Sequence, residues 1–150
     1  MQKRNPAEWL CLKRTVRFGE TDAAGVVHFL QLFKWCHEAW EESLEKFGIL
    51  PQDIFPTTQI NTNKLDFALP IVHCEADYFK PLYVGDFINI ELYPEKKNDY
   101  SFTLRFKFKK DGEEIGITNI RHVSINPMTR KKCLLSKEIN LWLSESFLIF

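Results

Sequence analysis

The feature that most restricts the fold of this chain is one long amphipathic segment, residues 29–47. At 100° per residue its apolar side chains gather on one face, opposite a face of lysine and glutamate. The apolar face holds Phe29, Leu32, Phe33, Cys36, Ala39, Trp40, Ser43, Leu44 and Phe47. Gly48 follows as a C-terminal cap and Pro51 prevents continuation. The pattern predicts a core helix beginning near His28, with Trp35 on the flank of its polar side.

Five further segments show the period-two alternation of β-strands. They are residues 9–18, 72–78, 88–92, 100–109 and 115–126. The pair Asp111-Gly112 is a strong hairpin signal, and the poor phase around Thr118 and Asn119 predicts a bulge. Because the last four strands follow one another through short connections, we expect them to be antiparallel neighbours in that order.

One long helix must therefore cover one face of a five-stranded sheet. An antiparallel sheet curled around the helix is the simplest α+β arrangement, and Ser136 is placed to cap a short C-terminal helix. The limited cover and an open sheet edge predict self-association, with a dimer that extends the sheet.

Length and composition exclude several classes of protein. At 150 residues we expect a single domain, residues 1–150, and 20 acidic residues balance 20 basic ones, so no net charge favours nucleic acid or a membrane surface. No signal peptide and no apolar run of ~20 residues is present, which favours a cytoplasmic protein. The four cysteines lie far apart and are expected to be reduced, most of them in the core.

The usual catalytic motifs are also missing. The chain has no G-x-S-x-G, no G-x-G-x-x-G and no P-loop, and its four histidines do not have the spacing of zinc ligands. We therefore expect no metal and no cofactor. The Arg130-Lys131-Lys132 run could bind a phosphorylated group, although a solvated face is the commoner interpretation.

A carboxylate just ahead of the long helix remains as the candidate site. Asp22 precedes a helix start at which N–H groups lack partners and carry partial positive charge. On this segment alone, two interpretations stay open: Asp22 caps the helix, which is the commoner arrangement, or the N–H groups hold an acceptor from a ligand. In the second case the site suits acyl transfer from an ester or thioester.

The segment VRFGETDAAGVVHFLQLFKW, residues 16–35, resembles the signature of hotdog-fold acyl-CoA thioesterases of the 4-hydroxybenzoyl-CoA thioesterase type. Residues 9–44 look most like 1,4-dihydroxy-2-naphthoyl-CoA thioesterases of phylloquinone (vitamin K1) synthesis. The resemblance spans nearly the whole chain and implies the hotdog fold, in which the sheet wraps around the long helix. It also implies a thioester hydrolase acting on an aromatic acyl-CoA.

The resemblance further assigns roles to residues of this chain. Asp22 would be the catalytic carboxylate, and the backbone N–H near Phe29, beside His28, would hold the thioester oxygen. The site would lie between two subunits of a homodimer or homotetramer. The partner would contribute residues from the region leading into the second strand, Ala68 to Val72. The candidates for binding the nucleotide end of CoA are Lys80, Arg130 and Lys131. One departure is Gln31, where relatives often have asparagine, and it bears on acyl preference.

Other functions remain open beside this one. A short- or medium-chain aliphatic acyl-CoA or acyl-carrier-protein thioesterase would use the same scaffold, and aromatic residues near the helix favour an aryl substrate only weakly. A non-catalytic acyl-binding module is the alternative of a different class, because a fold does not fix a function. A hotdog dehydratase is disfavoured, since His28 and His37 lack the expected acidic partner motif.

Overall fold

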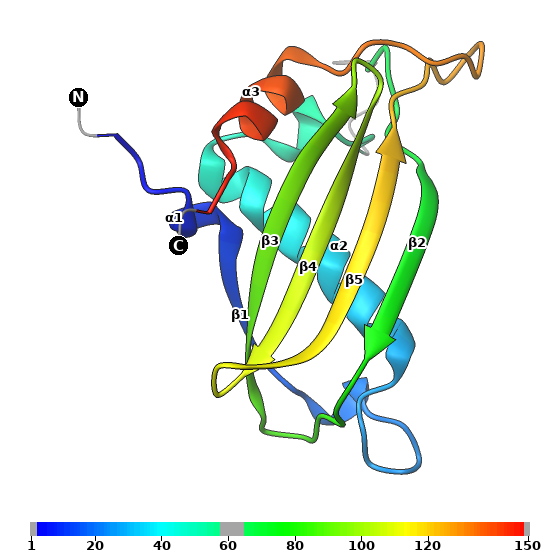
Figure 1. Ribbon diagram of the computed structural model, residues 1–150. Helices are drawn as coiled ribbons and strands as arrows, with labels where there is room; N and C mark the ends of the chain where they lie inside the picture. Colours follow the sequence, from blue (N-terminus) through cyan, green and yellow to red (C-terminus); the bar gives the residue numbers. More distant parts are fainter. Residues whose placement is uncertain (1–2, 58–64, 149–150) are drawn as a thin grey trace.

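The computed structural model describes residues 3–57 and 65–148 and has one sheet, one long helix and several short helices (Figure 1). In chain order the elements are α1 (Ala7–Leu10), β1 (Cys11–Thr15), the 3₁₀ helix η1 (Phe18–Glu20), α2 (Phe29–Phe47), the 3₁₀ helix η2 (Pro51–Asp53), β2 (Ile71–Tyr78), β3 (Phe87–Asn98), β4 (Ser101–Lys110), β5 (Glu113–Val123) and α3 (Lys137–Glu145). The antiparallel sheet curls around α2, which confirms the expected hotdog fold. Part of the expected connection between α2 and β2, residues 58–64, lies outside the described residues.

Helix α2 has the predicted limits. His28 is its N-cap, and Gly48 ends it with a φ of 114°, a conformation that glycine adopts without strain. The buried face follows the prediction with two exceptions: Phe29 is 55% exposed, whereas Trp35 is fully buried. The ring of Trp35 packs near Phe108 of the sheet, with centroids 6.3 Å apart, and its indole N–H donates to Glu20, in the segment before Asp22.

The strand order in the sheet is β1-β3-β4-β5-β2 (Figure 1). The predicted neighbours β3, β4 and β5 do pair in sequence, but the expected pairing of β2 with β3 is wrong, since β2 pairs with β5. The physical reason is the connection, residues 79–86, which is too long for a tight hairpin turn and runs past the ends of β5 and β4 to reach β3 (Figure 1). Strand β2 therefore forms one edge.

Two local predictions need correction. The first strand begins at Cys11 instead of Trp9, because residues 7–10 form α1, and it ends before Phe18. The bulge predicted at Thr118 and Asn119 is also wrong, as the register there is regular and shifts nearer the hairpin, beyond Phe108. Thr118 is polar but faces inward, where its hydroxyl lies 2.9 Å from Sγ of Cys36. An inward-facing polar residue thus produced the same sequence pattern as a bulge.

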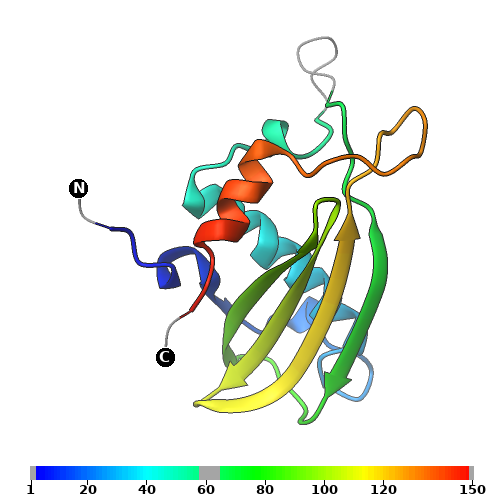
Figure 2. The same ribbon diagram turned by 45° about the horizontal axis from the view of Figure 1, so that its top comes forward.

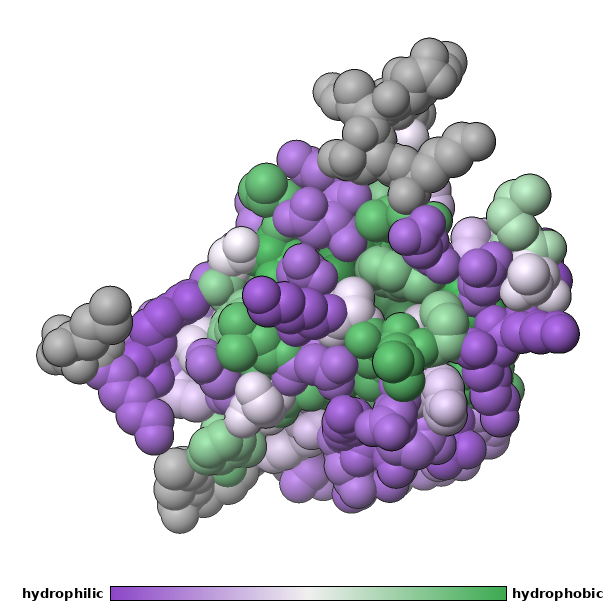
Figure 3. Space-filling view, turned by 90° about the horizontal axis from the view of Figure 1, so that it is seen from above, coloured by the Kyte–Doolittle hydropathy of each residue, from purple (hydrophilic) through white to green (hydrophobic). Residues whose placement is uncertain are grey.

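The core lies between the sheet and the two longer helices, which share one side of it (Figure 2). Ser136 caps α3 by accepting a hydrogen bond from the N–H of Ile139 at 3.2 Å, as predicted. The indole of Trp142 in α3 donates to the hydroxyl of Ser43 in α2 at 3.2 Å. Seen from the α3 end, apolar side chains reach the surface in the middle of the view, with hydrophilic ones along its lower border (Figure 3).

Strand β2 stays largely uncovered in the single chain. Its residues from Ile71 to Glu75 are all exposed, including Val72 at 55%. All four cysteines are free, but Cys11 and Cys74, which lie on the two edge strands, are exposed and not in the core as expected. The sheet therefore presents an open edge with apolar side chains.

Candidate active site

Asp22 lies in a short hairpin that folds back just before α2. Thr21 and Val27 form an antiparallel bridge, and the Asp22 N–H donates to the carbonyl of Val26 at 2.9 Å. Oδ1 of Asp22 accepts hydrogen bonds from the N–H groups of Ala24 at 2.8 Å and Val26 at 3.4 Å. Its other oxygen accepts none from the described residues, and the side chain is exposed. One carboxylate oxygen thus fixes the loop and the second faces outward.

The start of α2 is capped by a different residue. Nδ1 of His28 accepts a hydrogen bond from the N–H of Leu30 at 3.2 Å, and the His28 carbonyl accepts from Gln31 at 2.9 Å. The N–H of Phe29 donates to no acceptor within residues 3–57 and 65–148. Asp22 therefore does not cap the helix, and the first-turn amide of Phe29 is left as a donor beside the Asp22 hairpin.

A second loop supports the hairpin from the side of β2. The N–H of Val27 donates to the carbonyl of Leu82 at 2.9 Å, and the N–H of Leu82 donates to the hydroxyl of Tyr78 at 2.8 Å. Burial, joined by the negative charges of Asp22 and Asp86, raises the pKa of the Tyr78 phenol. Tyr78 thus stays neutral at pH 7 within electrostatic range of Asp22. No sequence pattern marked Tyr78 for the site beyond its place at the end of a strand.

The predicted site residues divide between the two ends of the sheet (Figure 1). Lys80 follows β2 near the Asp22 hairpin and forms an ion pair with Glu113. Ala68 lies before the other end of β2 and bridges Ile125. Arg130 belongs to the loop that follows β5 at that same end. Asp22, His28 and Phe29 are brought together within this chain, but Ala68, Arg130 and Lys131 lie away from them.

A basic depression of about 460 Å³ lies at the Ala68 end. It is lined by Val72, Asn98, Tyr100, Ser101, Arg121, Val123, Ile125, Arg130 and Lys132. Lys131 does not line it, whereas Arg121 and Lys132 do. Lys132 belongs to the run that could bind a phosphorylated group but was not among the CoA candidates, and Arg121 was not predicted. Lys132 bridges Ile125, whereas Arg130 has a left-handed backbone with a φ of 63°, so alternation along the run does not identify which of its residues line the depression.

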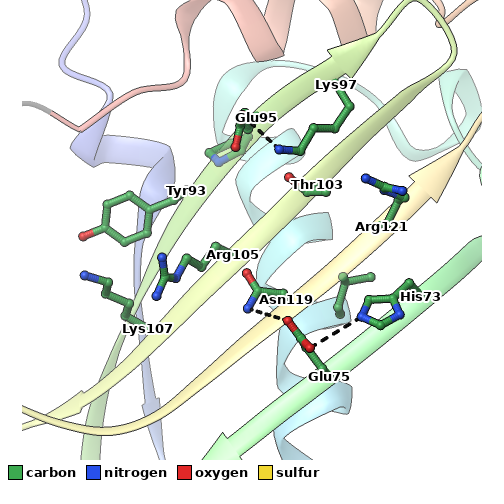
Figure 4. A pocket seen from close by; sticks show the side chains of 12 residues that line it. His73, Glu75, Tyr93, Glu95, Lys97, Thr103, Arg105, Lys107, Asn119 and Arg121 are labelled. Carbon is green, nitrogen blue, oxygen red and sulfur yellow. Dashed lines mark hydrogen bonds and ion pairs between the residues drawn. The ribbon is translucent and has the colours of Figure 1, made fainter.

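A larger depression of about 790 Å³ lies on the outer face of the sheet (Figure 4). Its lining mixes both signs of charge. Nε2 of His73 lies 3.6 Å from Oε2 of Glu75, and Lys97 forms an ion pair of 3.0 Å with Glu95. Asp22 lines neither depression. These two depressions therefore do not enclose the carboxylate, and residues 22–25 of the hairpin are exposed in the single chain.

The described residues contain no group of three or more His, Cys, Asp and Glu side chains arranged to hold a metal ion. Among the same residues, no helix combines the length and hydropathy needed to cross a bilayer. The buried thiol of Cys36 is no nucleophile, because burial raises its pKa to about 12.

The fold agrees with comparisons to known proteins. A 1,4-dihydroxy-2-naphthoyl-CoA hydrolase of Prochlorococcus marinus strain NATL1A is 77% identical over 150 residues, which is the full length of both chains. A crystal structure of a candidate thioesterase from Prochlorococcus marinus strain MIT 9313 is 49% identical, with a TM-score of 0.93 over 96% of this chain and 100% of that one.

A crystal structure of a 1,4-dihydroxy-2-naphthoyl-CoA thioesterase from Synechocystis is 28% identical, with a TM-score of 0.80 over 90% of this chain and 95% of that one. The model of the thioesterase-like superfamily matches residues 16–143. This match begins just before the Asp22 hairpin and ends within α3, so it includes the hairpin and four of the five strands, β2 to β5. The chain belongs to the thioesterase-like superfamily.

Proposed function

We propose that this protein hydrolyses 1,4-dihydroxy-2-naphthoyl-CoA to the free acid and CoA, as a step of phylloquinone synthesis in the cytoplasm. The observation that carries the chemistry is the placement of the Asp22 carboxylate in a hairpin beside the free Phe29 N–H. The substrate is supported by the 77% identity to a hydrolase of that name.

The reaction needs a donor for an oxygen that gains charge and a group that delivers the nucleophile. The Phe29 N–H, at the positive end of α2, is the donor to the thioester carbonyl oxygen. The outward oxygen of Asp22 acts on the carbonyl carbon or on a water beside it. The C–S bond then breaks, the acyl group leaves as a carboxylic acid, and the CoA thiolate takes up a proton.

Two routes are open to Asp22. As a general base it removes a proton from the attacking water, and as a nucleophile it forms a mixed anhydride that water then opens. A single turnover in heavy-oxygen water distinguishes them. Water that opens the anhydride at the Asp22 carbonyl leaves the label in the Asp22 peptide, whereas general-base attack places it only in the product acid.

We place the complete site between two subunits that pair through their β2 edges. At about 3.4 Å per residue, the eight residues of β2 separate the Asp22 end from the Arg130 end by roughly 25 Å. Antiparallel pairing of β2 with its own copy would set the Arg130 end of one subunit beside the Asp22 end of the other. Such pairing would also cover the exposed Val72 and complete the sheet.

In this arrangement the basic depression of the partner would take the phosphates of CoA. Arg121, Arg130 and Lys132 line it, and none of these three forms an ion pair within the described residues. Lys80 is already paired with Glu113, and Lys131 lies outside the depression, so both are weaker candidates than the sequence suggested.

A substrate panel tests the proposal. CoA release would be followed with a thiol reagent for 1,4-dihydroxy-2-naphthoyl-CoA, other aryl-CoA esters, aliphatic acyl-CoA esters and acyl-carrier protein. We expect kcat/KM to be highest for the naphthoyl ester. A higher value for aliphatic esters would assign the aliphatic alternative, and tight binding without release would assign a binding module.

A further inference from the structure

A hydrogen bond joins the Asp22 segment to the middle of α2. The indole N–H of Trp35 donates to Oε2 of Glu20 at 2.7 Å, and Trp35 is fully buried. Glu20 lies two residues before Asp22 and is half-buried. A bond to an ionised carboxylate is about twice as strong as one between neutral groups, so this contact is a firm attachment.

Glu20 is also bonded through two other groups. Its Oε1 accepts a hydrogen bond from the N–H of Arg17 at 2.7 Å, which closes η1. Its backbone carbonyl accepts from the N–H of His28, the N-cap of α2, at 3.4 Å. One residue therefore contacts the turn before the hairpin, the cap after it and the helix behind it.

The hairpin itself has few other attachments. Residues 22–25 are exposed, so packing does not fix them. On the far side, Val27 is buried and bonded to Leu82, which holds that strand of the hairpin. The other strand of the hairpin, which leads into Asp22, depends on Glu20. The Glu20 carboxylate makes the side-chain hydrogen bond that joins residues 19–22 to α2.

We infer that Glu20 and Trp35 are positioning residues, which hold the Asp22 hairpin in register with the first turn of α2. Neither residue touches the substrate in this account. The Glu20–Trp35 bond sets where the Asp22 carboxylate lies relative to the Phe29 N–H, and the inference rests on the proposed function of those two groups. A shift of about 1 Å between reacting groups is enough to cost up to ~10²-fold in rate.

Three variants test this inference. Trp35→Phe keeps an aromatic ring in the core but removes the N–H donor. Glu20→Gln keeps the size of the side chain, but its amide group cannot accept both hydrogen bonds. Trp9→Phe is the matched control, because Trp9 is as buried as Trp35 and also donates an indole hydrogen bond. Its acceptor is the hydroxyl of Ser146, 2.8 Å away at the C-terminal end of α3, and not a residue of the hairpin segment.

We expect Trp35→Phe and Glu20→Gln each to lower kcat about tenfold with KM within about twofold of wild type. The double variant should be no slower than the slower single variant, because both changes remove the same attachment. Trp9→Phe should keep kcat within about twofold while losing comparable thermal stability. A kcat for Trp35→Phe equal to that of Trp9→Phe, or losses that multiply in the double variant, would overturn the inference.

Hydrogen–deuterium exchange separates this inference from the proposed function. The amides of residues 20–28 should exchange faster in Trp35→Phe and Glu20→Gln than in wild type or Trp9→Phe. Unchanged exchange there refutes the attachment even if the enzyme is active. If wild-type protein releases no CoA from any thioester, the proposed function fails, and faster exchange in the two variants still supports the attachment of the hairpin. If Trp35→Phe does not fold, Glu20→Gln tests the attachment by itself, because Glu20 is only half-buried.

Discussion

Nδ1 of His122 lies 2.8 Å from the carbonyl oxygen of Leu69, so a buried ring on β5 holds the segment that leads into β2. The ring packs between Trp40 and Phe102, with centroid distances of 4.6 and 5.2 Å. Because the carbonyl only accepts, Nδ1 carries the proton in the neutral ring. This contact fixes the approach to Ala68, which the proposed site takes from the partner subunit.

The burial of His122 predicts a pH dependence of stability. Burial lowers its pKa to about 4, from about 6.5 in the unfolded chain. Between these values the unfolded state binds more protons, so stability is complete above pH ~6.5 and falls as the pH drops toward 4. We expect the protonation of His122 to lower the free energy of unfolding by about 3 kcal/mol across that range. Urea unfolding of wild type and His122→Phe would measure it.

The comparison of wild type with His122→Phe at each pH is its own control. At pH 7, His122→Phe should be less stable, because the Leu69 carbonyl loses its donor at a cost of about 1–3 kcal/mol. That deficit should shrink or reverse by pH 4. A difference between the two proteins that stays constant from pH 7 to pH 4 would show that His122 does not set the dependence.

The basic depression predicts which residues recognise the phosphates of CoA. Arg130→Glu and Lys132→Glu should raise KM for the acyl-CoA by tenfold or more, because each replaces a charge that attracts phosphate with one that repels it. Neither change should affect the matching acyl-pantetheine ester, which has no phosphate. Lys131→Glu is the control for a general loss of positive charge. Equal effects of all three substitutions would argue against a defined subsite.

The open edge of the sheet predicts the assembly. Cys74 is exposed near the middle of β2, so Cys74→Glu should leave the subunit folded but set like charges against each other across the two-fold contact. Light scattering should show a shift toward monomer, and activity should fall with it. Thr15→Glu, on the opposite edge strand, should leave the assembly intact. A dimer unaffected by Cys74→Glu would place the interface elsewhere.

The cap of α3 predicts a local loss of stability. Ser136→Ala removes the acceptor for the Ile139 N–H and should cost about 1 kcal/mol in the free energy of unfolding. Ser144→Ala, in the same helix but exposed, should stay within about 0.5 kcal/mol of wild type. Urea titration of the two variants makes the comparison, and equal losses would show that the cap contributes nothing particular.

Periodicity predicted the elements well because each lies against one continuous core. It located α2 to within a residue and identified every strand. Periodicity failed for residues whose surroundings are formed by a distant part of the chain. Trp35 lies on the flank of the helix, and its surroundings include Glu20 and Phe108, which come from other parts of the chain. The pairing of β2 with β5 depends on the path of residues 79–86, which local pattern does not specify.

The site residues divide in the same way into those that local sequence predicted and those that it did not. Asp22, His28 and Phe29 are close in sequence, so one motif brought them together. Tyr78, Arg121 and Lys132 reach their positions through sheet register and loop path, and no local pattern marked Tyr78 or Arg121. The resemblance indicated the region around Ala68 but not the separation from Asp22, which follows from the length of β2.

The most direct test of the account is CoA release from 1,4-dihydroxy-2-naphthoyl-CoA by Asp22→Asn. Asparagine keeps the oxygen that accepts from Ala24, so the hairpin and the melting temperature should be unchanged. We expect kcat to fall by about 10²–10⁴-fold. Glu45→Gln, an exposed charge removed at the far end of α2, should keep full activity. Wild-type turnover by Asp22→Asn would contradict the central claim.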